Sequence, residues 1–146
     1  MDPEAFRFWG KRMVDYIADY WTRVGKDYQP IPPVKPGYIW DLVPPDPPET
    51  PHSWDDIFQD LEKVVVSKNT HWLHPRFFAY FPTSNSYPAL LAEMLSGALG
   101  CMGFTWSSGP ACTELEMAMM DWLAKVLKLP EYFLNNHPGP GAGMIQ

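Results

Sequence analysis

Two histidines and two glutamates are the first residues in this sequence whose types and spacing could do chemistry. His71 and His74 form a His-x-x-His pair, and histidine is a common metal ligand. The pair lies outside any expected helix and no carboxylate completes a ligand set, so we predict no metal site. Glu114 and Glu116 are two residues apart on an expected helix, which points their side chains in different directions. We interpret them as first-turn charges that favour the helix dipole rather than as an acid–base pair.

Two cysteines and a glycine-rich stretch complete the set of reactive or ligand-binding candidates. Cys101 and Cys112 lack a Cys-x-x-Cys spacing and a neighbouring base, so we predict that both are buried, reduced and unreactive. Gly139, Gly141 and Gly143 precede an expected strand instead of following one, unlike the dinucleotide-binding fingerprint. None of these patterns by itself assigns a reaction.

Aromatic residues concentrate in two irregular stretches, 70–87 and 101–108. Eight of the eighteen residues in the first stretch are aromatic when its two histidines are counted. An irregular loop of this kind is costly to order unless it lines a site. Composition leaves two interpretations open, which are ordinary core and a surface that binds an aromatic ligand.

The overall composition restricts the classes of function. The chain has 146 residues and a net charge of −6, with 46% hydrophobic and 19% charged residues, which argues against disorder and against nucleic acid as a partner. No apolar run approaches the roughly 18 residues of a membrane-spanning helix. The acidic N-terminus lacks the apolar region of a secretory signal, so we expect a cytoplasmic protein.

Four helices are expected to position the two aromatic stretches. An amphipathic pattern predicts a helix over 3–24 that stops at Gly25, and Ser53 is the expected cap of a second helix that ends at 67–69. Further helices are expected over 88–100 and 110–129, with a short helical turn over 131–134. Nine prolines between residues 30 and 51 predict an extended polyproline II linker over 26–52.

The apolar side chains of the last two long helices form stripes that we expect to be buried. They are Leu90, Leu91, Met94, Leu95, Ala98 and Leu99 in the third helix, and Leu115, Met119, Trp122, Leu123, Val126 and Leu127 in the fourth. The tail, 135–146, has the composition of a loop that enters a strand. We therefore expect the chain to be the first part of a larger protein.

Eight short motifs follow one another along the chain. They are Met13-Val14-Asp15-Tyr16, Pro36-Gly37-Tyr38, Thr70-His71-Trp72, Phe77-Phe78-Ala79-Tyr80-Phe81-Pro82-Thr83, Ser86-Tyr87-Pro88-Ala89, Gly103-Phe104-Thr105-Trp106, Pro110-Ala111-Cys112-Thr113-Glu114-Leu115-Glu116 and Met120-Asp121-Trp122-Leu123. In these motifs the sequence resembles the group II pyridoxal-phosphate-dependent amino-acid decarboxylases. Within that family the N-terminal portion of the aromatic-L-amino-acid (dopa/tryptophan) decarboxylases is most similar. Histidine decarboxylases tend to carry His-Ala-Tyr-Tyr-Pro-Ala where this chain has Phe78 to Thr83. Gly109 departs from the serine usual before Pro110, which affects a helix cap.

The resemblance implies a fold and an organisation. The fragment would be mainly α, and the whole enzyme would have the α/β architecture of fold-type I pyridoxal-phosphate enzymes. Residues 1–85 would form an N-terminal helical segment that wraps over a partner subunit, and 86–146 would begin the large cofactor-binding domain. A homodimer would also explain the aromatic face of residues 3–24, which we expect to find no partner within one short chain.

The resemblance also implies a substrate pocket and a reaction. Its expected lining residues are Trp72, Tyr80, Phe81, Pro82 and Thr83, with Met102 and Phe104 reaching it from the neighbouring subunit. Thr83 would hydrogen-bond near the substrate carboxylate. The reaction would be that of a lyase, namely pyridoxal 5'-phosphate-dependent decarboxylation of dopa, tyrosine, tryptophan or 5-hydroxytryptophan to the amine and carbon dioxide.

The chemical machinery of such an enzyme is incomplete in this chain. None of the seven lysines lies in a motif like the family's cofactor-binding His-Lys. We therefore expect no catalytic, cofactor-binding or metal-binding residue here, and no activity from the chain alone. The remainder would be a separate chain or a missing part, and the sequence does not tell whether the end at Gln146 is a natural cleavage, a nick or an engineered boundary.

Three alternatives stay open at this stage. An aromatic acetaldehyde synthase carries out oxidative decarboxylation and deamination on the same substrates, and a histidine decarboxylase belongs to the same family. A non-catalytic dimerisation module is the alternative from another class. The sequence also leaves open which aromatic amino acid is preferred.

Overall fold

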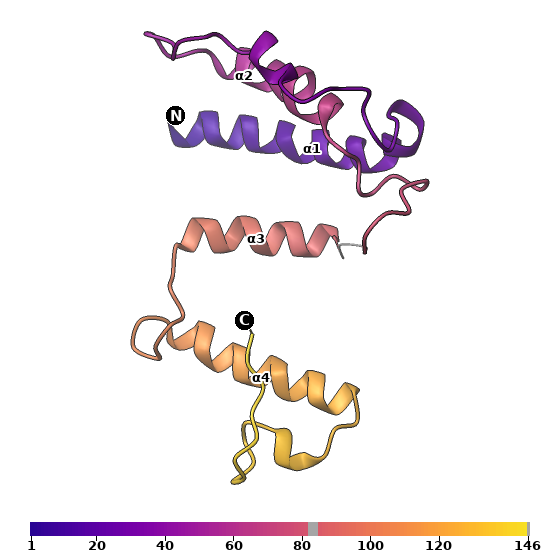
Figure 1. Ribbon diagram of the computed structural model, residues 1–146. Coiled ribbons are helices and arrows are strands. Elements are labelled where there is room, and N and C mark those ends of the chain that lie inside the picture. Colours follow the sequence, from indigo (N-terminus) through magenta and orange to yellow (C-terminus); the bar gives the residue numbers. More distant parts are fainter. Residues whose placement is uncertain (82–84, 146) are drawn as a thin grey trace. The chain divides into compact units, whose positions relative to one another are not determined.

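The computed structural model describes residues 1–81 and 85–145. These residues form helices joined by turns and irregular segments, with no strand among them (Figure 1). The long helices are α1 (Pro3–Asp27), α2 (Trp54–Asp60), α3 (Tyr87–Leu99) and α4 (Pro110–Val126). The mainly α character predicted for the fragment is confirmed. The chain divides into two compact units, Met1–Ser84 and Asn85–Gln146. In the described ranges, every helix is too short or too polar to cross a membrane.

Helix α1 begins as expected and ends later than expected. The Asp2 side chain accepts a hydrogen bond from the Ala5 backbone N–H at 2.8 Å, and Pro3 occupies the first turn. The predicted stop at Gly25 is wrong, because the helix continues to Asp27. A Cβ at Gly25 would lie 2.7 Å from Cγ of Pro75, so this glycine allows a close approach between two segments.

The aromatic face of α1 packs on α2 within the first unit. The Trp9 ring lies 6.2 Å from the Trp54 ring and 5.7 Å from the Phe58 ring, and Tyr16 meets Phe58 edge-to-face at 5.6 Å. The Arg12 guanidinium lies 4.6 Å from the Trp9 ring centroid. The expectation that this face finds no partner within the chain is therefore wrong for Trp9.

The segment after α1 differs from the predicted extended linker over 26–52, and the second helix differs from the predicted helix that ends at 67–69. The proline-rich stretch contains a 3₁₀ turn, η1 (Tyr38–Asp41), which follows Gly37 at a φ of 94°. The Ser53 side chain caps α2 by accepting from the Asp56 backbone N–H. Beyond Asp60 the chain forms a π-helical turn, η2 (Leu61–Val65), and a 3₁₀ turn, η3 (Val66–Lys68). A π turn changes which side chains face α1, and this one carries Glu62.

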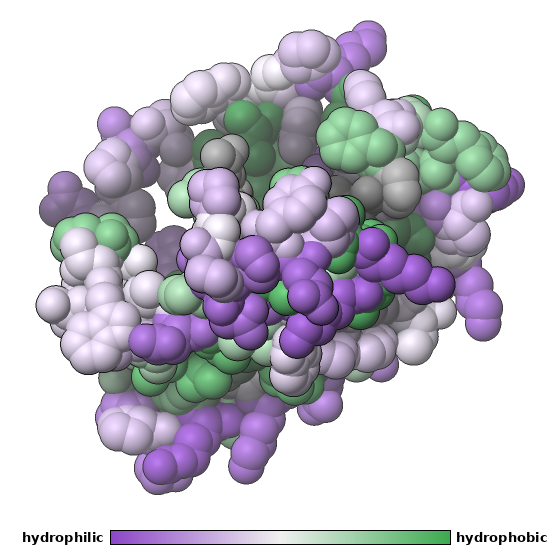
Figure 2. All heavy atoms as spheres, turned by 90° about the horizontal axis from the view of Figure 1, so that it is seen from below, coloured by the Kyte–Doolittle hydropathy of each residue, from purple (hydrophilic) through white to green (hydrophobic). Residues whose placement is uncertain are grey.

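The second unit contains α3, α4 and the 3₁₀ turn η4 (Glu131–Phe133), which confirms the short turn expected there. The predicted burial of the apolar stripes on α3 and α4 is wrong. Leu99 is 66% exposed, Trp122 64% and Val126 77%, because two helices and their connections supply too few partners to cover these faces. Hydrophobic side chains accordingly reach the surface in Figure 2, where they are green. The following residues of the predicted stripes are also exposed: Leu90, Leu91, Met94, Leu95, Ala98, Leu115, Leu123 and Leu127, whereas Met119 is half-buried.

The tail folds back on α4 through polar contacts. The nearly buried Asp121 carboxylate accepts from the Asn135 backbone N–H at 2.6 Å and from the Asn135 amide at 3.0 Å. These hydrogen bonds, the backbone one foremost, lower the pKa of Asp121. A Cβ at Gly141 would overlap the Tyr132 carbonyl oxygen. The tail forms no strand in the residues described up to 145, so the expected strand entry is not found there.

Candidate substrate-binding site

Three aromatic rings of the first unit form an open cluster. The rings of Trp72 and Tyr80 are stacked, with centroids 5.4 Å apart and planes 14° from parallel. Phe77 lies 5.3 Å from Trp72 and 6.4 Å from Tyr80. Trp72 is 42% exposed and Tyr80 82% exposed, so these rings keep free faces. Such faces suit a flat aromatic ligand, because offset stacking and area burial both contribute to its affinity.

Tyr80 holds an unusual backbone conformation. Its φ is 58°, in the left-handed region that residues with a Cβ seldom adopt. Such a conformation costs about 1–3 kcal/mol and persists where the surroundings determine it, often at binding sites. Here it accompanies the stacking of Tyr80 on Trp72.

Two buried histidines shape the loop that carries the cluster. His71 and His74 are only 2% and 3% exposed. The backbone N–H of His71 donates to the Pro30 carbonyl at 2.9 Å, and the backbone N–H of His74 donates to the His71 carbonyl at 2.9 Å. Nδ1 of His74 accepts from the Arg76 N–H at 3.0 Å. These turns belong to the segment that carries Trp72 and Phe77, whose rings contact each other.

The electrostatics around His71 favour its neutral form. Burial, followed by the nearby His74, lowers the pKa of His71. Its Nδ1 lies 2.9 Å from the Tyr20 hydroxyl, and its ring lies 4.4 Å from the Tyr28 ring. Within the described ranges no three His, Cys, Asp or Glu side chains gather as they would around a metal ion. The two histidines act here as buried supports of the loop.

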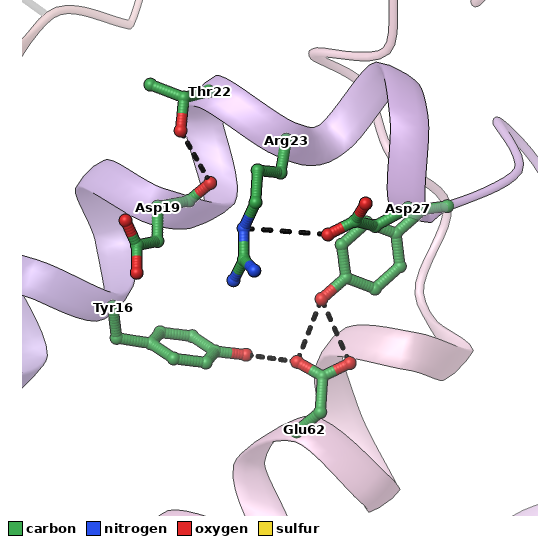
Figure 3. A network of polar contacts seen from close by, with 7 residues as sticks. Tyr16, Asp19, Thr22, Arg23, Asp27 and Glu62 are labelled. Carbon is green, nitrogen blue, oxygen red and sulfur yellow. Dashed lines mark hydrogen bonds and ion pairs between the residues drawn. The ribbon is translucent and has the colours of Figure 1, made fainter.

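A carboxylate in the π turn ties this loop support to α1. Glu62 accepts hydrogen bonds from the Tyr16 hydroxyl at 2.6 Å and the Tyr28 hydroxyl at 2.9 Å (Figure 3). Burial and the bond to Glu62 raise the pKa of Tyr16 and raise that of Tyr28 to about 12. The network joins the middle of α1, through Tyr16, and its C-cap residue, Tyr28, to η2.

Within the second unit, the loop between α3 and α4 carries two further residues that the sequence analysis named. Met102 is 67% exposed and Phe104 77% exposed. The Ser108 hydroxyl donates to the Met102 carbonyl at 2.8 Å, and the Trp106 indole N–H donates to the Glu114 carboxylate at 2.8 Å. The loop is therefore folded on itself, and Phe104 projects from an ordered turn.

The residues expected to line a pocket divide into three groups. Trp72 and Tyr80 are in contact, and Phe81, which is 75% exposed, follows them directly. Met102 and Phe104 share the loop of the second unit. Pro82 and Thr83 lie outside the described residues.

Sequence reasoning missed two residues that matter for this geometry. Phe77 completes the aromatic cluster, and its signal was present, since it lies in the aromatic motif that contains Tyr80. Glu114 holds Trp106, a role that helix position alone did not indicate.

Comparison with known proteins relates these motifs to a family. Residues 36–146 match the model of the pyridoxal-dependent decarboxylase conserved domain. The chain belongs to the pyridoxal-dependent decarboxylase family.

Individual relatives agree with this assignment. The mouse aromatic-L-amino-acid decarboxylase is 54% identical over 147 residues, which cover 100% of this chain and 30% of that protein. Among solved structures, Catharanthus roseus tryptophan decarboxylase in complex with L-tryptophan has a TM-score of 0.86 and 47% identity, over 92% of this chain and 28% of that one. Rhodiola rosea 4-hydroxyphenylacetaldehyde synthase has a TM-score of 0.91 and 40% identity, over 100% of this chain and 31% of that one. The chain thus spans about 30% of the length of the mouse relative.

The family's cofactor can be tested against the residues of this chain. A pyridoxal cofactor is held by a lysine amine. All seven lysines here are exposed or half-exposed, on helix surfaces and in connecting segments, and none is enclosed. They do not fit that role, so we assign no cofactor-binding residue in this chain.

Proposed function

We propose that the full-length protein is a carboxy-lyase that uses pyridoxal 5'-phosphate to convert aromatic L-amino acids into amines and carbon dioxide. The observation that carries the proposal is the open aromatic cluster of Trp72, Phe77 and Tyr80. The names of the relatives, aromatic-L-amino-acid decarboxylase and tryptophan decarboxylase, support an aromatic substrate. The preferred amino acid among dopa, tyrosine, tryptophan and 5-hydroxytryptophan is left to experiment.

In this proposal the chain supplies part of the substrate pocket. Trp72, Tyr80 and Phe81 contact the substrate ring, and a contribution of Pro82 and Thr83, which lie outside the described residues, stays a prediction from the sequence. Met102 and Phe104 reach the pocket from the neighbouring subunit. Each ring contact of this kind contributes about 0.5–1.5 kcal/mol beyond area burial.

An aromatic acetaldehyde synthase is the second candidate function. The likeness to the Rhodiola synthase along the whole of this chain favours it specifically. Both candidates bind the same class of amino acid, so an aromatic cluster serves either. They differ in their products.

We also propose a homodimer in a reducing, cytoplasmic compartment. Phe6 and Phe8 on α1 are each 55% exposed, which supports a partner for that part of the helix. Cys101 and Cys112 are free thiols whose sulfurs are 3.1 Å apart, which suits a reducing compartment.

The test uses the purified full-length protein with added pyridoxal 5'-phosphate and a panel of aromatic L-amino acids. We expect carbon dioxide and the amine in equal amounts, measured by mass spectrometry. Aldehyde together with ammonia would instead identify the synthase. No turnover of any aromatic amino acid would leave the non-catalytic dimerisation module.

Phe104→Ala in the same protein tests the pocket. We expect a roughly two- to ten-fold higher KM, equivalent to about 0.5–1.5 kcal/mol of lost ring contact. The melting temperature should change little, because the Phe104 side chain is largely exposed. Phe133→Ala is the matched control. It removes a ring that packs on Tyr132, with ring centroids 4.4 Å apart, instead of a ring of the proposed pocket. Normal kinetics and a much lower melting temperature for Phe104→Ala would show that Phe104 belongs to a core.

A further inference from the structure

The two cysteines of the second unit lie next to each other. Cys101 follows Gly100, the C-cap of α3, and Cys112 is in the first turn of α4. Their sulfur atoms are 3.1 Å apart. A disulfide bond has a sulfur–sulfur distance of about 2.05 Å, so a closing movement of about 1 Å would join them. The prediction that both cysteines are buried is wrong, because Cys101 is exposed and Cys112 half-buried.

Two glycines between the cysteines allow this approach. A Cβ at Gly103 would lie 3.1 Å from Cβ of Cys112. A Cβ at Gly109 would lie 3.1 Å from the Met102 carbonyl oxygen. The hydrogen bond from Ser108 to that same carbonyl closes the loop on itself. The near contact of the sulfurs is therefore built into the fold of loop 101–109, which begins at Cys101 and leads into the first turn of α4, where Cys112 lies.

Accessibility and hydrogen bonding give the two sulfurs different roles. Cys101 is open to a small oxidant, while the hydrogen bond to Cys101 raises the pKa of Cys112 and keeps its proton in place. The Cys101 sulfur would attack hydrogen peroxide, and its thiol proton would leave with the departing hydroxide as water, which gives a sulfenic acid. The Cys112 sulfur would then attack the sulfenic sulfur, and its proton would leave with the departing hydroxide as water. The sum is two thiols and one peroxide giving one disulfide and two waters.

We propose that Cys101 and Cys112 are a peroxide-sensitive pair that forms a reversible disulfide and thereby fixes loop 101–109. This loop carries Met102 and Phe104. The effect on the substrate pocket rests on the proposed function. If that function is correct, the disulfide displaces two residues of the pocket. The pair is then a site of oxidative control over substrate binding.

Peptide mapping of the full-length protein tests the disulfide directly. Reduced protein is exposed to hydrogen peroxide, alkylated under denaturing conditions, digested and analysed by mass spectrometry. We expect a cross-linked peptide containing both cysteines, with the loss of two hydrogens, that disappears after treatment with dithiothreitol. Alkylation of both residues after peroxide, or pairing of either one with another cysteine, would overturn the proposal.

Single variants identify the partners and separate the two parts of the proposal. Cys101→Ser and Cys112→Ser should each abolish the cross-link and keep the basal activity. In the unchanged protein, peroxide should raise KM for the aromatic substrate about ten-fold, since a misplacement of 1 Å can cost up to about a hundred-fold. Dithiothreitol should restore KM, and neither variant should respond to peroxide.

The outcomes are distinguishable from failure of the proposed function. A cross-link with unchanged kinetics would overturn the effect on the pocket and leave the modification site in place. A reduced protein with no activity toward any aromatic amino acid would overturn the proposed function, and the peptide map would still decide whether the disulfide forms.

Discussion

Glu62 shows how one side chain can organise a binding loop without touching a ligand. Its carboxylate accepts hydrogen bonds from the hydroxyls of Tyr16 and Tyr28. Tyr16 lies in α1, and Tyr28 is the C-cap residue of α1. Hydrogen bonds to a charged group are stronger than neutral ones, contributing about 1.5–3 kcal/mol each. Tyr28 also packs on the ring of His71, which precedes Trp72. The carboxylate therefore stabilises the loop that carries the aromatic cluster.

The raised pKa of Tyr28 predicts a specific loss of stability in alkali. The phenol must stay protonated to donate to Glu62, and its pKa of about 12 in the folded protein lies above the ordinary value of 10.0. Its contribution is therefore complete below about pH 10 and is lost as the pH rises through about 12. Tyr28→Phe should lower the free energy of unfolding by about 1–2 kcal/mol at pH 8, a value reduced by partial exposure.

Urea unfolding of the full-length protein at pH 8 and at pH 11 measures this effect. The difference between Tyr28→Phe and the unchanged protein should shrink at the higher pH. Tyr38→Phe is the control. Among the described residues, the tyrosine hydroxyls that donate to Glu62 are those of Tyr16 and Tyr28, so the Tyr38 hydroxyl is not part of this network. An equal difference at both pH values would show that the Tyr28 hydroxyl is not bound to the carboxylate.

At the scale of elements, α1 is positioned by a contact that local sequence patterns do not reveal. Glycine is a typical residue at the end of a helix, yet α1 continues past Gly25. Pro75 packs against Gly25 where a side chain would otherwise lie. The same helix contains Gly10, where an added Cβ would meet nothing within 4 Å. The two glycines therefore form a matched pair within one helix.

Substituting these glycines should shift stability in opposite directions. Gly10→Ala should stabilise the protein by about 0.5–1 kcal/mol, because alanine has the higher helix propensity. Gly25→Ala should destabilise it by about 1–3 kcal/mol, because the rigid proline ring cannot move aside without a backbone shift. Thermal unfolding of both variants of the full-length protein measures the two effects. Stabilisation by both would show that α1 and Pro75 are not in close contact.

At the scale of the whole molecule, the chain leaves much apolar surface open. Leu99, Trp122 and Val126 are each more than half exposed. Contiguous exposed apolar area is typical of interaction surfaces. The mouse relative is about three times as long as this chain, since the chain covers 30% of it.

The proposed homodimer predicts that Phe6 is an interface residue. Phe6→Ser in the full-length protein should weaken the dimer, because its ring is 55% exposed in the single chain. Trp9→Ala is the contrasting variant, since Trp9 packs on Trp54 and Phe58 and its loss should lower the melting temperature instead. Size-exclusion chromatography over a dilution series measures the dissociation. An unchanged dimer for Phe6→Ser across the series would contradict a role of this residue in dimerisation.

The sequence was informative where short-range chemistry decides the structure. The Asp2 and Ser53 caps, the helical character of the chain and the short turn after Pro130 followed from local patterns. Burial did not follow, because the second unit supplies too few side chains to cover the α3 and α4 stripes. The stacking of Trp72 on Tyr80 was not predictable either, since it depends on the left-handed backbone of Tyr80.

The contact of Gly141 with the Tyr132 carbonyl has a consequence for natural variation at this position. Any residue with a Cβ would collide with backbone, which cannot turn away as a side chain can. Such a variant would fold less efficiently and would be exposed to quality control in the cell. A missense change at codon 141 would therefore reduce the amount of folded protein per cell.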